Sequence, residues 1–268
     1  MQTHPQVDAI TVQNEPLHSS DPAWTMAMNA KQQATLIGRL SEALEVSPGL
    51  SDTEIWAYDH NTDRPDFPRY VLNHTRAGDV GAIAWHCYSS GRDKYRPLRE
   101  FAQDYPGVRQ VMTECWTHVD SGEKFFDLPE FVSQPVKHGA AGSLAWTVAG
   151  SVNYDVSYPG GCQPCSGLVQ VDMVHGNVSK THDYYTMGHF SHYVKNGDHY
   201  VPTVVGDHIY PDGTGVDTTA FVTSDGAKVA VIQNKIRTAL NLQLTFQGRN
   251  ESYLGTVPGR SVVTWRFD

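Results

Sequence analysis

The chain of 268 residues has little positive charge, no long apolar run and few cysteines. Its formal net charge is −9, and only 18% of its residues are charged. Nucleic-acid binding requires a basic surface, so this composition argues against a nucleic-acid partner. No stretch of 18 apolar residues occurs, so no membrane span is expected. These absences leave a globular protein that is large enough to bury a sizeable core and suits a neutral ligand.

The first residues also lack the features of a secretory leader. Residues 1–5 carry neither a basic head nor an apolar run, so no signal peptide is predicted. The chain is then cytoplasmic, processed, or truncated before residue 1.

Two motifs of cofactor chemistry are absent as well. No glycine-rich phosphate loop follows a predicted strand, which disfavours nucleotide binding. The 13 histidines are scattered, without the His-Glu-x-x-His pattern of zinc peptidases. We therefore expect no metal and no other cofactor. A zinc or CxxC redox protein stays an alternative that metal analysis would test.

The four cysteines fall into two groups. Cys162 and Cys165 have CxxC spacing in a segment rich in Gly and Pro, and neither further zinc ligands nor a thioredoxin-like context accompanies them. A small loop-closing disulfide is predicted there, as in secreted proteins. Cys87 and Cys115 each lie near the end of a predicted strand, and we expect them to be buried apolar thiols.

The chain does contain a repeated pattern of strands and helices. Apolar, β-branched runs predict strands over residues 7–12, 54–58, 80–85, 108–113 and 142–147. Helices are predicted from the Asp21-Pro22 pair to about residue 46, and over residues 66–74, 97–105, 128–138 and 181–194. This alternation is typical of a parallel sheet. From about residue 200, period-two alternation with short turns predicts antiparallel strands and a small β-sandwich.

Two glutamates closely follow predicted strands. Glu15 comes after the first strand, and Glu114 comes after the fourth. The carboxyl ends of parallel strands form the active face of a TIM barrel, and two carboxylates are the minimum for cleaving a glycosidic bond. A glutamate at a strand end is also a common capping or ion-paired group. The two together, with aromatic residues close by, favour a glycosidase.

Four segments together resemble glycoside hydrolase family 30. They are residues 11–16 (Thr-Val-Gln-Asn-Glu-Pro), 85–88 (Trp-His-Cys-Tyr), 113–116 (Thr-Glu-Cys-Trp) and 188–191 (Gly-His-Phe-Ser), with a β-rich tail after them. The resemblance covers essentially the whole chain. It implies an α/β fold, in which strands four to eight of a (β/α)8 TIM barrel occupy residues 1–198 and a small antiparallel β-sandwich occupies residues 199–268. It also implies an O-glycosyl hydrolase that retains anomeric configuration through a covalent intermediate.

The resemblance assigns roles by position. Glu15 matches the acid/base and Glu114 matches the nucleophile. In the same way Asn14 would bind the sugar 2-hydroxyl, Tyr88 would orient Glu114, and His86 would line the sugar subsite. Further candidates for substrate contact are Asp59, His60, Trp116 and Trp146. The alternative for Asp59 and His60 is a structural hydrogen-bonded pair. The alternative for the two tryptophans is packing in the core. His189 is expected to link the barrel to the sandwich.

The substrate expectation also comes from the resemblance. The Cys-Trp pair after Glu114 and the loop rich in Gly and Cys resemble the endo-β-1,6-galactanase branch of the family, whose members are secreted. A β-linked oligo- or polysaccharide is therefore the expected partner, with galactan first. An endo-β-1,6-glucanase and a glucosylceramidase-like enzyme are the alternatives.

One departure from the family concerns the position of Glu15. In enzymes of this clan the acid/base follows the fourth barrel strand, whereas here it follows the first predicted strand. We therefore expect a fragment or a truncated gene product, with an open sheet edge that favours self-association. An inactive, carbohydrate-binding remnant is the alternative from another functional class.

Overall fold

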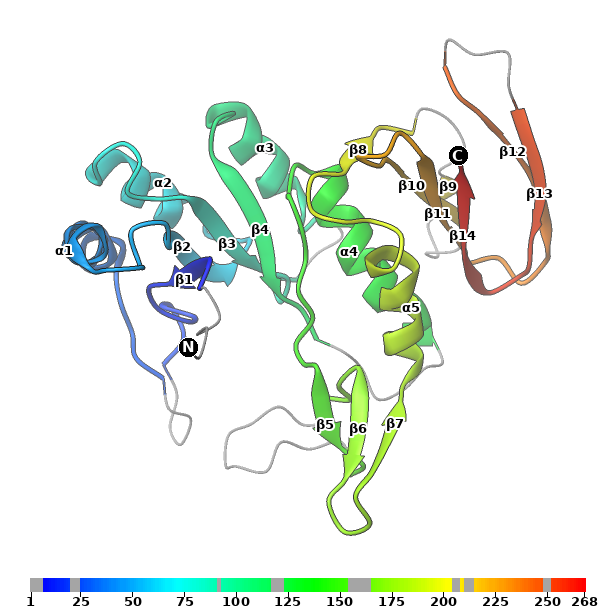
Figure 1. The fold of residues 1–268 in the computed structure, drawn as a ribbon, viewed down its shortest axis with the longest axis horizontal. Helices are drawn as coiled ribbons and strands as arrows, with labels where there is room; N and C mark the ends of the chain where they lie inside the picture. Colours follow the sequence, from blue (N-terminus) through cyan, green and yellow to red (C-terminus); the bar gives the residue numbers. More distant parts are fainter. Residues whose placement is uncertain are drawn as a thin grey trace.

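A computed structural model describes residues 7–19, 25–90, 93–116, 123–153, 165–203, 208–209, 215–247 and 252–268 (Figure 1). Its first part is a parallel sheet in the order β1-β2-β3-β4. The strands are β1 (Ala9–Thr11), β2 (Glu54–Asn61), β3 (Ala82–His86) and β4 (Arg109–Glu114). The helices between them are α1 (Ala30–Val46), α2 (Asp66–His74) and α3 (Arg96–Asp104), and they lie along one side of the sheet. The alternating strands and helices predicted from the sequence are thus confirmed.

The fifth predicted strand lies beside β4 but pairs with it intermittently. Parallel bridges join Met112 to Ser143 and Trp116 to Trp146. The Met112 amide donates to the Gly142 carbonyl at 2.9 Å, and the Leu144 amide donates to the Met112 carbonyl at 2.8 Å. Five parallel segments therefore follow one another in chain order, as in consecutive units of a barrel.

The core fills the space between the sheet and its helices. All five residues of β3 are buried, because a parallel strand in this position is covered on both faces. Trp85 packs edge-on against Tyr58 and Phe101, and the side chains of all three are fully buried. Such aromatic packing fixes the spacing between neighbouring strands, and so fixes where their carboxyl ends lie.

The first helix begins later than its predicted start. Residues 25–29 are not helical, and α1 begins at Ala30. The Asn29 side chain accepts from the Gln32 amide at 2.9 Å, and the Gln32 side chain accepts from the Asn29 amide at 2.9 Å. This capping box satisfies two amides that would otherwise lack partners. The Asp21-Pro22 pair lies outside the described residues.

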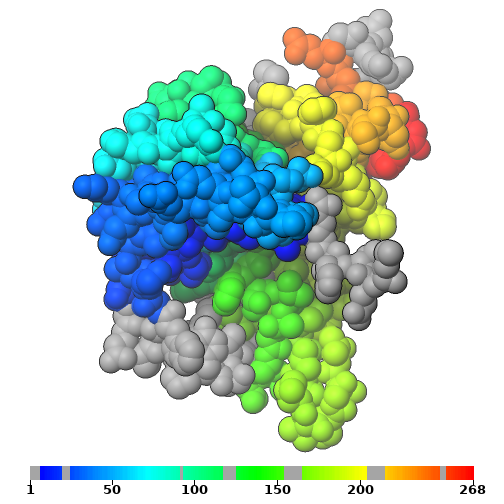
Figure 2. Space-filling view, turned by 60° about the vertical axis from the view of Figure 1, so that its left-hand side comes forward, coloured from blue at the N-terminus to red at the C-terminus, as the bar shows by residue number. Residues whose placement is uncertain are grey.

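The segment after residue 147 contains structure where a long loop was expected. The strands β5 (Ala149–Ser151), β6 (Val169–Asp172) and β7 (Asn177–Lys180) form a three-stranded sheet in that order. They are short, and β7 is exposed throughout, so no apolar pattern marks them in the sequence. Figure 2 shows this sheet, in yellow-green, projecting from the body of the molecule.

The last part of the chain is the expected β-sandwich. One sheet has the order β14-β11-β10-β8, with β9 paired to β10, and β12 and β13 form a second sheet. The bounds are β8 (His199–Val201), β9 (His208–Ile209), β10 (Gly215–Val222), β11 (Lys228–Asn234), β12 (Leu240–Thr245), β13 (Ser252–Val257) and β14 (Ser261–Phe267). A separate apolar core of Val216, Ala230, Ile232 and Val257 lies between the sheets. We propose residues 198 and 199 as the boundary between the two parts.

Two helices connect the parallel sheet to the sandwich. They are α4 (Asp127–Lys137), which follows the short helix η1 (Glu123–Phe126), and α5 (His182–Ser191). The buried Asp217 carboxylate of β10 pairs with Lys137 of α4. The hydroxyl of Thr264 donates to the carbonyl of His189 at 3.0 Å and lies 2.9 Å from the ring Nδ1 of the same residue. The expected structural role of His189 is thus confirmed.

Membrane insertion was not expected from the sequence. In the part of the chain that the structure describes, no helix combines the length and the apolarity needed to cross a bilayer.

Candidate active site

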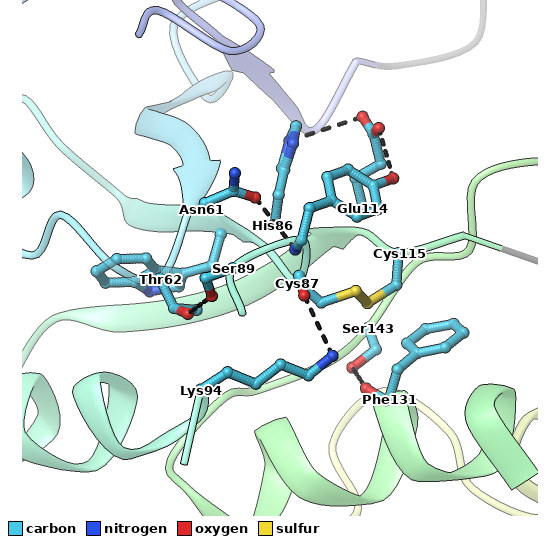
Figure 3. The surroundings of a disulfide bond; sticks show 12 residues. Asn61, Thr62, His86, Cys87, Ser89, Lys94, Glu114, Cys115, Phe131 and Ser143 are labelled. Atoms are coloured by element: carbon cyan, nitrogen blue, oxygen red, sulfur yellow. Dashed lines mark hydrogen bonds and ion pairs between the residues drawn. A yellow bond between two sulfur atoms is a disulfide. The ribbon is translucent and has the colours of Figure 1, made fainter. Parts of the chain in front are cut away.

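The predicted site residues gather where the parallel strands end. His86 ends β3, Glu114 ends β4, and Glu15 follows β1 after a short turn. His86 and Glu114 are register partners on neighbouring strands, so their side chains leave the sheet side by side (Figure 3). Parallel pairing therefore brings together groups that lie about a hundred residues apart in the sequence.

His86 is the centre of the cluster and contacts three carboxylates. Its Nδ1 lies 3.2 Å from Glu15 Oε1, and its Nε2 lies 3.0 Å from Asp59 Oδ1 and 3.7 Å from Glu114 Oε2. Burial by itself would lower the pKa of this side chain, which is only 1% exposed. The hydrogen bonds to Asp59 and Glu15 and the charge of Glu114 outweigh burial and raise the pKa of His86 to about 9. At neutral pH the ring is therefore an imidazolium.

Glu15 lies in an unusual backbone conformation. Its φ is 46°, in the left-handed region that non-glycine residues seldom adopt. Its amide donates to the carbonyl of Asp59 at 3.0 Å, which holds the turn against the end of β2. The hydrogen bond from His86 lowers the pKa of the Glu15 carboxyl, against the opposing effect of burial. Backbone strain of this kind clusters at functional sites.

Glu114 lies deeper and is held by a tyrosine. The hydroxyl of Tyr88 donates to Glu114 Oε1 at 2.8 Å. Burial raises the pKa of Glu114, while the charge of His86 and the Tyr88 hydrogen bond act in the opposite direction. The backbone amide of Tyr88 in turn donates to Asn61 Oδ1 at 3.1 Å, which fixes the position of the tyrosine. The predicted contact between Tyr88 and Glu114 is thus present.

Asp59 enters the cluster through an irregularity in β2. The register between β2 and β3 shifts between Tyr58 and His60, and Tyr58 and Asp59 both have positive φ. A bulge of this kind re-aims a side chain. Asp59 accepts from Thr113 Oγ1 at 2.7 Å as well as from His86. These two hydrogen bonds join Asp59 to the cluster around His86, and this network differs from the pair with His60 that was one alternative.

His60 lies buried beside His86. The two ring centroids are 6.4 Å apart, and burial lowers the pKa of His60. Within the described residues its Nδ1 has no hydrogen-bond partner. A neutral ring at this place adds no second positive charge next to the imidazolium.

The predicted aromatic residues lie at the surface beside the cluster. Trp116 is 45% exposed and Trp146 is 37% exposed, so neither is a core residue. The ring of Trp116 lies 5.0 Å from that of Tyr88. Asn14 is also exposed, and among the hydrogen bonds of the described residues none joins its side chain to the cluster.

Thr113 and Asn61 also belong to the hydrogen-bond network, although neither is among the residues predicted from the sequence. Both stand at strand ends next to predicted residues, Thr113 before Glu114 and Asn61 after His60. Their side chains position Asp59 and Tyr88 respectively. Polar side chains at the carboxyl ends of these strands were the available signal.

The prediction for Cys87 and Cys115 was wrong, because the two form a disulfide. The register pairs His86 with Glu114, so the residues that follow them are neighbours. Their Cα atoms are 5.3 Å apart, within the range that a disulfide spans. Cys165 is disulfide-bonded too. The predicted bond between Cys162 and Cys165 involves Cys162, which lies outside the described residues.

Among the described residues, one group of three side chains could hold a metal ion. Single ligand atoms of Glu15, His86 and Glu114 all lie within 4.8 Å of one another. A protonated imidazole has two N–H donors and no lone pair for a metal, so a cation would have to displace the proton of His86.

Comparison with known proteins places the chain in a family. Residues 205–265 match the model of the "Glycosyl hydrolase family 30 beta sandwich domain". The chain is 39% identical over 264 residues to an endo-1,6-beta-D-glucanase of Neurospora crassa, a match that covers 97% of this chain and 54% of that protein. The chain belongs to glycoside hydrolase family 30. It is also 38% identical over 261 residues to endo-1,6-beta-D-glucanase BGN16.3 of Trichoderma harzianum, covering 97% of this chain and 51% of that protein.

Solved structures agree with this family 30 assignment at the level of the fold. The chain superposes on SrfJ from Salmonella typhimurium with a TM-score of 0.83 at 19% identity, and on the endo-beta1,6-glucanase BT3312 with a TM-score of 0.79 at 24% identity. Each match covers 97% of this chain and 57% of the other. The chain spans about half the length of the curated relatives it matches.

Proposed function

We propose that this chain carries the catalytic pair of a retaining endo-β-1,6-glucanase. The observation that carries the proposal is the close approach of two carboxylates at the ends of β1 and β4. One oxygen of Glu15 lies within 4.8 Å of one oxygen of Glu114. Retaining glycosidases separate their two carboxyl groups by about 5–5.5 Å, whereas inverting enzymes leave about 6.5–9.5 Å for a water molecule.

The choice of glucan follows from the relatives. Those from Neurospora crassa and Trichoderma harzianum bear the name endo-1,6-beta-D-glucanase and match 97% of this chain. The galactan expected from the sequence has no such support. We therefore take the glucan alternative as the main proposal, and galactan becomes a substrate to be compared with it.

In the proposed first step Glu114 attacks the anomeric carbon. The bond from that carbon to the leaving oxygen breaks, and the leaving oxygen takes the electron pair and a proton from Glu15. In the second step Glu15 takes a proton from water, the water oxygen bonds to the anomeric carbon, and Glu114 leaves as a carboxylate. The hydrogen bond from Tyr88 to Glu114 favours the ionised form that the attack requires.

The acid step needs a proton on Glu15, whose pKa is lowered by His86. His86 can supply this proton, because its ring is an imidazolium and its Nδ1 lies 3.2 Å from Glu15 Oε1. Transfer of the proton from Nδ1 to Glu15 converts the ion pair into a neutral pair, which leaves the total charge of the cluster unchanged. We propose that His86 and Glu15 act together as one acid, with apparent pKa values that belong to the pair.

The test uses the full chain on β-1,6-glucan and β-1,6-galactan. Glu114→Gln and Glu15→Gln are expected to lower kcat by about 10³-fold, since each removes one of the two groups that act on the bond. Glu100→Gln, on an exposed turn of α3, is the matched control and should be unchanged. Proton NMR of the first product should show the β anomer.

Azide separates the two roles. With Glu114→Ala, azide should take the place of the nucleophile and give an α-glucosyl azide. With Glu15→Ala it should react with the glycosyl-enzyme and give a β-glucosyl azide. The opposite products would reverse the assignment. A chain that hydrolyses neither polysaccharide but binds β-1,6-linked oligosaccharides by calorimetry would be the carbohydrate-binding remnant instead.

A further inference from the structure

The Cys87–Cys115 disulfide joins the two strand ends that carry the catalytic cluster. Cys87 directly follows His86, and Cys115 directly follows Glu114. Figure 3 shows the sulfur bridge beneath His86 and Glu114, between them and the helix that carries Phe131. The cross-link is therefore one residue away from two members of the cluster.

The backbone ladder between β3 and β4 ends at this point. The register shifts between Trp85 and His86, and the amide of Cys87 donates to the carbonyl of Glu114 at 3.2 Å. Beyond it the two segments turn to other partners. The amide of Tyr88 donates to Asn61, while the carbonyl of Cys115 accepts from Trp146 at 2.7 Å. The disulfide thus joins the segments where they begin to separate.

The cluster depends on how these two segments are placed relative to each other. The first segment contributes His86 and Tyr88, and the second contributes Thr113 and Glu114. The Tyr88–Glu114 hydrogen bond of 2.8 Å and the 3.7 Å approach of His86 to Glu114 both cross between them. A shift of the segments by a fraction of an ångström would change both contacts.

Both cysteines are buried, and they also border a cavity. A cavity of about 320 Å³ is lined by both cysteines, together with Lys94, Tyr88 and Trp116. The ammonium of Lys94 donates to the carbonyl of Cys87 at 3.2 Å, so a positive charge lies next to the disulfide. The cavity therefore extends up to the two bridged residues, and a cation beside the disulfide favours a thiolate once the bond opens.

We propose that the Cys87–Cys115 disulfide is a positioning cross-link of the active site, which holds the segment of His86 and Tyr88 against that of Glu114 and whose reduction lowers turnover. This rests on the function proposed above. In the reduction a dithiol such as dithiothreitol supplies two electrons and two protons. The S–S bond breaks, two thiols form, and the dithiol is oxidised to its own cyclic disulfide.

The test compares the full chain with Cys87→Ala/Cys115→Ala. The matched control is Ile232→Ala, which weakens the sandwich core and leaves the site untouched. The first readout is the NMR titration of the His86 ring in histidine-labelled protein, assigned with His86→Gln. We expect a pKa of about 9 in the parent and in the control. In the double variant the carboxylates are less closely held, so the pKa should fall toward its ordinary value.

The second readout separates turnover from binding. On β-1,6-glucan, kcat of the double variant should fall about 10-fold to 100-fold with KM little changed. Dithiothreitol should produce the same loss in the parent and no further loss in the double variant. If the double variant does not fold, Cys87→Val/Cys115→Ala refills the lost volume and takes its place.

The possible outcomes are distinct. A double variant with the parent's His86 titration and kcat would overturn the proposal and leave the disulfide as a support for stability only. If the parent hydrolyses no glucan, the proposed function fails, while the His86 titration still decides whether the disulfide positions the cluster.

Discussion

The charged state of His86 predicts that the protein loses stability as pH rises toward 9. The ring has an ordinary pKa of 6.5 in the unfolded chain and about 9 in the folded one. A folded pKa above the unfolded value means that the stabilisation is complete below pH 6.5 and is lost as pH rises through 9. At about 1.4 kcal/mol for each pH unit, the full contribution is about 3 kcal/mol. Because the side chain is 1% exposed, solvent does not screen it appreciably.

Urea unfolding between pH 7 and 9.5 measures this effect. The free energy of unfolding of the parent should fall by about 2 kcal/mol over the interval. This is less than the full contribution, because pH 7 already lies above the pKa of 6.5 that His86 has in the unfolded chain. His86→Gln should be less stable at pH 7, because it leaves Glu15, Asp59 and Glu114 together without a cation. Its stability should change little between pH 7 and 9.5.

The matched control is His192→Gln, an exposed histidine away from the site, which should keep the parent's slope. If His86→Gln does not fold, Glu15→Gln removes one of the three carboxylates and should reduce the slope instead. A parent whose stability is flat between pH 7 and 9.5, or a variant at residue 86 with the same slope as the parent, would refute the reasoning.

Three further predictions follow from single contacts. Tyr88→Phe removes the hydrogen bond that lowers the Glu114 pKa, so the acid limb of the pH profile of kcat should move to higher pH. The value of kcat should also fall about 10-fold. An acid limb at the parent's position would contradict this. Asp217→Asn leaves Lys137 without its buried partner and should cost about 3–5 kcal/mol in urea unfolding, whereas Asp225→Asn, in an exposed pair, should change little. Asn29→Ala removes the α1 capping box and should lower the free energy of unfolding by about 1 kcal/mol. A variant as stable as the parent would contradict this.

Much of the fold could be predicted, because the periodicity of apolar residues and the order of strands and helices along the chain indicate it. The strands at residues 54–58 and 108–113 are apolar runs between helices, and such runs predict a parallel sheet without any knowledge of contacts. The sheet β5-β6-β7 was missed because its strands are three or four residues long and β7 is exposed, so no buried face imposes a pattern.

The structure brings Glu15, Asp59, His86 and Glu114 together, but the sequence does not indicate that His86 lies at the centre of this cluster. Their places after strands make Glu15 and Glu114 candidates, whereas for His86 the family resemblance implies only that it lines the sugar subsite. Its contact with three carboxylates depends on the bulge that turns Asp59 inward and on the positive φ of Glu15. Neither irregularity has a signature in the sequence, since Asp59 and Glu15 are not glycines.

The disulfide between Cys87 and Cys115 was predictable in principle. Each cysteine follows a strand-end residue of the cluster, and consecutive parallel strands are usually neighbours. Considering each cysteine separately concealed the pairing, because a buried thiol and a half-cystine occupy the same kind of apolar position.

The ion pairs between α4 and the sandwich make that helix a shared component of both parts of the chain. Lys137 and Glu130 of α4 bind Asp217 and Lys235 of the sandwich, while Glu130 also lines the cavity beside the disulfide. The sandwich is therefore not an independent module that can be exchanged among relatives by cutting at the linker. A foreign sandwich would need an acidic residue in place of Asp217 and a basic one in place of Lys235. Without them the mismatch would affect the cavity beside the disulfide as well as the junction.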